Sequence, residues 1–174
     1  MKNMFMAILI CSISIGNLSA QEPNRNSAKA AKMLDQTFAT AAAEAGVTEV
    51  EMGKLGEEKA TSPRVKEFSQ MMVKDHTKAN EELRSWTKEN NMTWPTLPAT
   101  GKNNHKVLKD KSGAEFDRAF MKQMIDDHQR AITLFEDEVK NGQNEEMRTW
   151  ASKKLVTLKK HLAEAQQIYN ELNK

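Results

Sequence analysis

The chain has 174 residues, a length typical of one domain. Its 26 Lys and Arg residues nearly balance its 24 Asp and Glu residues. Both signs are interspersed, as on solvated helix faces, so the charge pattern does not indicate nucleic acid or an anionic membrane as a partner.

The first twenty residues differ sharply from the rest of the chain. Lys2 precedes an apolar run over 4–15, and small residues then lead to Ala20 ahead of a polar stretch. This order is typical of a secretory signal peptide (1–20) that is cleaved after Ala20. An uncleaved anchor is the alternative, although the apolar run is short for a membrane span. We interpret 21–34 as a flexible leader and 35–174 as the folded domain.

The only cysteine, Cys11, lies in the predicted signal peptide. Ile10 before it is not the small residue that a lipid-attachment site needs, so Cys11 is interpreted as part of the discarded segment. The mature chain would then have no cysteine, which excludes disulfides, thiolate nucleophiles and cysteine-ligated zinc. It would also have no stable membrane span after cleavage.

Two helices are predicted in the first half of the domain. The first covers 35–60, with Asp35 as a plausible N-cap. The second covers 63–90, with Ser62 as its cap and Pro63 at the first helical position. Both show apolar residues at alternating three- and four-residue steps, which indicates one buried face per helix.

Two further helices are predicted in the second half, and no strand pattern competes with them. One begins at Ser112 or Glu115 and ends at Asn141, with Gly142 as the stop. The last covers 144–173. The fold class is therefore predicted to be all-α.

The lengths of the connections predict the topology. Short connections join the first helix to the second and the third to the fourth, so each pair should be antiparallel. The connection over 91–112 has no helical period and is unusually long for a helical bundle. A crossing of the bundle would make the second and third helices parallel, as in a ferritin-like four-helix bundle with one long crossover. An up-down bundle with a loose middle loop is the alternative.

Three histidines fall at one level of this bundle. His76 and His128 lie at equal distances from the starts of the second and third helices, and His161 lies at a similar distance from the end of the fourth. His105, in the crossover, is interpreted as incidental. Glu49 reaches the same level on the first helix, at a position where an apolar residue is expected.

A buried carboxylate requires a partner, a proton or a metal ion. Three imidazoles and a carboxylate are ligands that suit zinc, copper, iron or manganese. We therefore predict a transition metal site made of Glu49, His76, His128 and His161. The alternative is a buried polar network of His–Asp and His–Glu pairs.

The surroundings of two histidines repeat along the chain. Residues 68–79 and 120–131 share the pattern F-x3-M-[VI]-x-D-H-x2-A. Asp75 and Asp127, which precede the histidines, are predicted to orient metal-ligating imidazoles on neighbouring helices. Met72 and Met124 could supply thioethers to a copper site, but methionines at such positions are more often core residues.

Several runs resemble a bacterial family of exported proteins, the domain-of-unknown-function family 4142. They cover 49–55, 72–80, 116–132 and 158–162, and the resemblance extends over about 35–172. It implies a ferritin-like fold and a periplasmic location, without an established activity. Members are often labelled predicted outer membrane proteins, which leaves association with the outer membrane open.

The chain departs from the iron-storing ferritins. Their sites use Glu-x-x-His pairs, whereas Val73, Ile125 and Leu158 stand three residues before the histidines. A mononuclear, histidine-rich site is therefore favoured over a di-iron centre. The leading hypothesis is a metal-binding bundle in metal handling or stress protection. A structural or interaction protein, whose polar layer only sets helix register, is the second, and a redox enzyme is the third.

Overall fold

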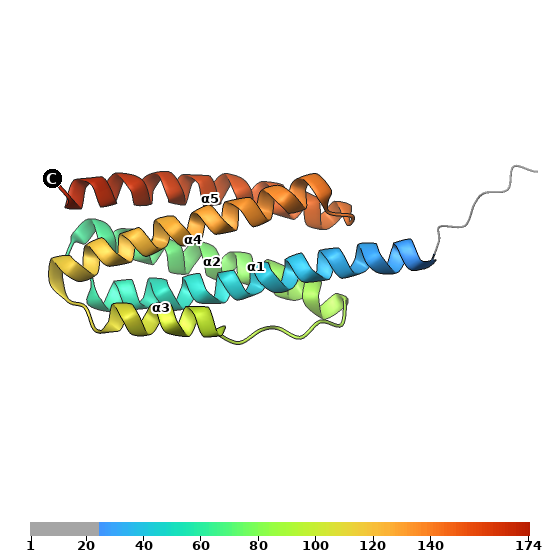
Figure 1. The fold of residues 1–174 in the computed structure, drawn as a ribbon, viewed down its shortest axis with the longest axis horizontal. Coiled ribbons are helices and arrows are strands. Elements are labelled where there is room, and N and C mark those ends of the chain that lie inside the picture. Colours follow the sequence, from blue (N-terminus) through green and yellow to red (C-terminus); the bar gives the residue numbers. More distant parts are fainter. Residues whose placement is uncertain (1–24) are drawn as a thin grey trace, which may run out of the picture.

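The computed structural model describes residues 25–174, whose secondary structure is entirely helical (Figure 1). The helices are α1 (Arg25–Lys59), α2 (Pro63–Glu89), α3 (Ala99–Lys109), α4 (Gly113–Asn141) and α5 (Glu145–Leu172). The predicted signal peptide, its cleavage site and Cys11 lie outside the described residues. Within the described part, no helix is both long and apolar enough to cross a membrane.

The helices form two antiparallel hairpins, α1 with α2 and α4 with α5. Figure 1 shows that α2 and α4 start at the same end of the bundle, so they are parallel and the segment between them crosses its length. The predicted all-α bundle with a long crossover is confirmed.

The crossover contains a helix that the sequence did not predict. Residues 91–112 were expected to be irregular, but α3 occupies half of this segment and packs on α1 and α4. Only Val107 and Leu108 are large apolar residues in α3, too few to show a helical period. Of these two, only Leu108 is buried. Tertiary packing therefore stabilises α3 more than any amphipathic pattern of its own.

The first helix begins well before the predicted position. The segment 25–34 belongs to α1, so within it the expected flexible leader is replaced by helix. Asp35 is consequently not an N-cap of its own helix. It is buried, and its Oδ1 accepts hydrogen bonds from the backbone N–H groups of Gln143 (2.9 Å) and Asn144 (3.2 Å), in the turn between α4 and α5.

A second buried aspartate has the same role at the other end of the bundle. Asp117 of α4 accepts hydrogen bonds from the backbone N–H of Thr61 (3.0 Å), its hydroxyl (2.6 Å) and the backbone N–H of Ser62 (2.8 Å). These donors belong to the turn between α1 and α2. Each hairpin thus supplies a carboxylate that holds the turn of the other, which fixes their relative register.

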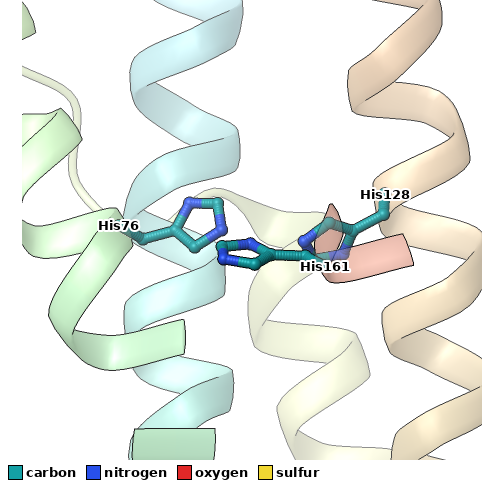
Figure 2. Close-up of side chains that lie close together, drawn as sticks. All are labelled: His76, His128 and His161. Carbon is teal, nitrogen blue, oxygen red and sulfur yellow. The ribbon is translucent and has the colours of Figure 1, made fainter. Parts of the chain in front are cut away.

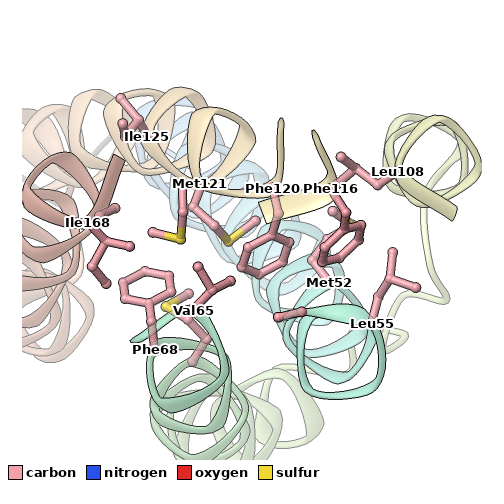
Figure 3. Close-up of a cluster of buried hydrophobic side chains, with 14 residues drawn as sticks. Met52, Leu55, Val65, Phe68, Leu108, Phe116, Phe120, Met121, Ile125 and Ile168 are labelled. Atoms are coloured by element: carbon pink, nitrogen blue, oxygen red, sulfur yellow. The ribbon is translucent and has the colours of Figure 1, made fainter. Parts of the chain in front are cut away.

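The apolar core is divided into two clusters. The larger one lies near the α1–α2 turn and is rich in methionine and phenylalanine; Figure 3 labels ten of its side chains: Met52, Leu55, Val65, Phe68, Leu108, Phe116, Phe120, Met121, Ile125 and Ile168. The second cluster contains Phe38, Leu83, Trp86, Phe135 and Met147, among others. The layer of histidines separates the two.

Glycines allow α1 and α2 to approach closely beside the larger cluster. A Cβ atom on Gly53 would lie 2.8 Å from Val73 Cγ2 and 3.1 Å from the carbonyl oxygen of Ser69. A Cβ atom on Gly56 would collide with the Ser69 hydroxyl and lie 2.8 Å from the Phe120 ring. The absence of a side chain at both positions therefore sets the distance between the helices that carry Glu49 and His76.

Candidate metal centre

Three buried imidazoles converge in the middle of the bundle (Figure 2). His76 comes from α2, His128 from α4 and His161 from α5. The ring centroids are 5.5–5.7 Å apart, and one nitrogen of each ring lies within 4.8 Å of the corresponding nitrogens of the other two. The predicted layer is thus a compact group that draws on both hairpins.

Hydrogen bonds orient two of the rings. His128 Nδ1 is 2.8 Å from the Met124 carbonyl oxygen, one turn earlier in α4. His161 Nε2 is 3.1 Å from Asp75 Oδ2, across the interface between α5 and α2. The carbonyl and carboxylate oxygens accept these hydrogen bonds, so each of the two nitrogens is assigned as the donor.

Each ring also has one nitrogen that is buried and without a hydrogen bond within the described chain. These atoms are His76 Nε2, His128 Nε2 and His161 Nδ1. The hydrogen bonds of His128 and His161 leave these atoms as lone-pair donors. Buried polar atoms without partners are destabilising. Three neighbouring imidazoles, each with a buried nitrogen of this kind, are a ligand set that suits a transition metal ion.

The electrostatics of the layer keep the rings neutral. Burial first and the neighbouring His161 second lower the pKa of His128 from 6.5 to about 4, against the opposing effect of the Met124 carbonyl. Burial, His128 and His161 all lower the pKa of His76. Burial also lowers the pKa of His161, although Asp75 opposes this shift. Neutral rings are the form that binds metal, so few protons would have to leave.

Glu49 lies beside the group rather than within it. The side chain is buried, its Oε1 is 3.8 Å from His128 Nδ1, and its Oε2 has no partner. The carboxylate does not lie within 4.8 Å of all three ligand nitrogens. Burial raises the pKa of Glu49, as does Asp127, while burial lowers the pKa of His128, so both shifts oppose an ion pair between the two side chains.

The two aspartates that precede histidines have different partners. Asp75 reaches His161 on α5, as described above. Asp127 instead accepts hydrogen bonds from Gln123 (2.9 Å) and Arg130, both on its own helix, and the structure does not bring it to a histidine. A shared motif therefore leads to two environments, because the neighbouring helix decides which group meets the carboxylate.

The other candidates lie outside the group. Met72 and Met124 are fully buried in the larger apolar cluster, which is the environment of core residues. His105 lies on α3, partly exposed.

Sequence reasoning did not find a cavity of about 180 Å³ that ends at His76 and His161. Its lining includes Ala79 and Ala131, the alanines that close the repeated pattern D-H-x2-A. The alanine three positions after both His76 and His128 was the signal that could have indicated it.

The fold and the site define an all-α bundle with one long crossover and a buried group of three histidines. The chain belongs to the family described as domain of unknown function DUF4142, which it matches over residues 20–168. This confirms the resemblance noted in the sequence. A comparison with curated protein sequences finds no significant match.

Solved structures share the fold at low sequence identity. A DUF305 protein from Streptomyces coelicolor, described as secreted, has a TM-score of 0.71 and 12% identity, covering 80% of this chain and 92% of its own. CopM in its Cu(I)-bound form has a TM-score of 0.68 and 21% identity, covering 79% and 96%. CopM in its Cu(II)-bound form has a TM-score of 0.69 and 20% identity, with the same coverage.

Proposed function

We propose that this protein binds a transition metal ion through His76, His128 and His161, as an exported bundle in metal handling or stress protection. The observation that carries the proposal is a group of three buried imidazoles with ligand atoms within 4.8 Å of one another, in which each ring has a buried nitrogen without a hydrogen bond. An ion would satisfy all three at once. Export is supported by the signal-peptide pattern of 1–20 and by the secreted description of the DUF305 neighbour.

The ligand set and the similar solved structures indicate which metals to test. Neutral imidazoles bind zinc, copper and iron better than they bind hard cations, and manganese was also predicted as a candidate. CopM has been solved with Cu(I), with Cu(II) and with silver. Copper is therefore the first metal to test, with zinc as the closed-shell reference.

Calorimetric titration of the wild-type protein against a triple His→Ala variant tests the proposal. The wild type should bind one ion, and saturation at about 100 times the dissociation constant should add about 2.7 kcal/mol of stability. For a chain of this size that corresponds to a rise in melting temperature of about 5–10 °C. Equal, weak binding by both proteins would contradict the proposal.

The two aspartates provide a matched pair of variants. Asp75→Asn removes the carboxylate that orients His161 and should weaken metal binding by about 10–100-fold. Asp127→Asn changes the same position of the repeated motif but touches no histidine, so metal affinity should stay the same. Equal losses of metal affinity in both variants would show that the contact between Asp75 and His161 does not determine metal affinity.

Ligation of the metal ion by Glu49 as a fourth ligand remains a prediction. The conservative variant Glu49→Gln distinguishes a ligand from a neighbour, because loss of a ligating carboxylate should weaken divalent ions more than monovalent ones.

A structural role for the layer is the second candidate. It is favoured by the hydrogen bonds that His128 and His161 already make without an ion. In that case the triple variant would lose stability, and no metal would raise the melting temperature of the wild type.

A further inference from the structure

The cavity beside the histidines is partly open to solvent and has small residues on three of the four helices that line it. They are Ala42, Ala45 and Gly46 of α1, Ala79 of α2 and Ala131 of α4. Leu83, Phe135 and Leu158 form the side toward the second apolar cluster. The small side chains leave room for a ligand beside the histidines, and burying apolar surface there would stabilise its binding.

The volume suits a small organic molecule. A dry apolar cavity of about 150 Å³ accommodates benzene, and this one measures about 180 Å³. Part of its lining is polar, because it includes His76 and His161, two of the proposed metal ligands. A ligand there would have an apolar body against the alanines and a polar head toward the histidines.

The charges indicate the sign of that head. Lys78 and Lys154 line the cavity together with two carboxylates, Glu49 and Asp75. Lys154 also pairs with Glu82 at 2.6 Å. Even with all three carboxylates counted as ionised, the two lysines leave a charge of −1, and a divalent ion on the histidines would make it +1. A site with three protein ligands also keeps one coordination position for water or a substrate.

We propose that this cavity binds a small organic monocarboxylate, about the size of benzoate, with its carboxylate on the ion held by the histidines. The inference rests on the proposed metal site. The carboxylate of the ligand occupies the open coordination position, and its ring or chain fills the space next to Ala42 and Ala79. The metal centre is then open to an exogenous ligand, unlike a closed structural site.

Benzoate titration of the zinc-loaded protein, followed by backbone amide NMR, tests this proposal. Saturable shifts are expected at the amides of Ala45, Ala79 and Ala131. Ala42→Leu fills the cavity from α1, which carries no histidine ligand, and should weaken benzoate binding by at least about tenfold. Its zinc affinity should stay within about twofold of the wild type. Ala163→Leu, on the exposed face of α5, is the matched control and should bind benzoate normally.

Two other probes separate the parts of the proposal. Benzyl alcohol has the ring without the charge, and acetate has the charge without the ring, so both should bind more weakly than benzoate. Benzyl alcohol binding as tightly as benzoate would overturn the assignment of an anion. Benzoate binding that is unchanged in Ala42→Leu would overturn the assignment to this cavity.

Failure of the metal site can be told apart from failure of the cavity. If zinc does not bind, the proposed function falls, and titration of the metal-free protein with benzyl alcohol still decides whether the cavity holds a ring. No shift with benzoate in either form, alongside normal zinc binding, would overturn the cavity inference alone.

Discussion

Replacing His128 with leucine should make the metal-free protein less sensitive to acid. The imidazole is fully buried, and its pKa is lowered from 6.5 to about 4, first by burial and then by His161. In the unfolded chain it would titrate near about 6.5. Between these values the unfolded chain binds a proton that the folded chain does not. The free energy of unfolding therefore falls as pH drops through this range.

The size of the effect follows from the two pKa values. Linkage gives a loss of about 2 kcal/mol at about pH 5 and about 3 kcal/mol at about pH 4, with almost none at about pH 7. His128→Leu lacks this loss, so its stability relative to the wild type should rise by those amounts. His76 and His161, whose pKa values are also lowered, stay in both proteins. Glu49, whose pKa is raised, acts in the opposite direction and also stays in both.

Urea unfolding with a chelator present, from about pH 4 to about pH 7.5, measures the difference between the two proteins. His105→Leu is the control, because His105 lies on α3 outside the layer, and its profile should follow the wild type. Parallel profiles for the wild type and His128→Leu would refute the reasoning. So would an NMR titration of His128 with a midpoint near about pH 6.5.

Two further predictions concern packing and a second buried acid. Gly53→Ala should destabilise the protein by about 1–3 kcal/mol in urea unfolding, because the new methyl meets the Val73 side chain, and Val73→Ala in that background should restore part of the loss. Glu138→Gln should be more stable than the wild type by about 1–3 kcal/mol above about pH 7 but not at about pH 4.5. Burial and the nearby Asp35 raise the pKa of Glu138 from 4.5 to about 7, so its wild-type stability falls as pH rises between those values. Glu136→Gln, on the exposed face, should show no such pH dependence; equal profiles of the two variants would contradict this account.

The position of the histidine layer could be predicted from spacing alone. Helix rise is constant, so residues at equal distances from the helix ends reach the same level once the topology is known. The loop length supplied the topology, and His76, His128 and His161 do meet. The rotation of each side chain about its helix could not be predicted in the same way, and Glu49 consequently reaches the right level beside the group.

The role of a carboxylate depended on contacts that no local pattern contains. Asp75 and Asp127 occupy the same position of the repeated pattern, yet only Asp75 faces a histidine of another helix. Asp35 has the chemistry of an N-cap, but its carboxylate accepts from the N–H groups of Gln143 and Asn144, in the turn that leads into α5, far away in the chain. Sequence reasoning recognised the chemical capacity of these groups and could not assign their partners.

The two turn-holding aspartates should control the metal site from a distance. His76 belongs to one hairpin, whereas His128 and His161 belong to the other, so their convergence depends on how the hairpins dock. Asp117→Ala leaves three donors without their acceptor and should destabilise the protein by about 2–4 kcal/mol, whereas Asp126→Ala, in an exposed pair with Lys122, should lose less than about 1 kcal/mol.

Combining Asp117→Ala with Asp35→Ala removes the hold at both ends. If the proposed metal site is correct, the double variant should keep its helices by circular dichroism but bind zinc at least about tenfold more weakly, because the hairpins can then slide and the three nitrogens no longer stay preorganised. Titration is done under conditions where unfolding curves show the variant folded. Lower stability with unchanged zinc affinity would mean that core packing alone aligns the histidines. A larger loss of zinc affinity in the double variant than in either single variant would instead show that Asp35 and Asp117 set the helix register that aligns the three histidines.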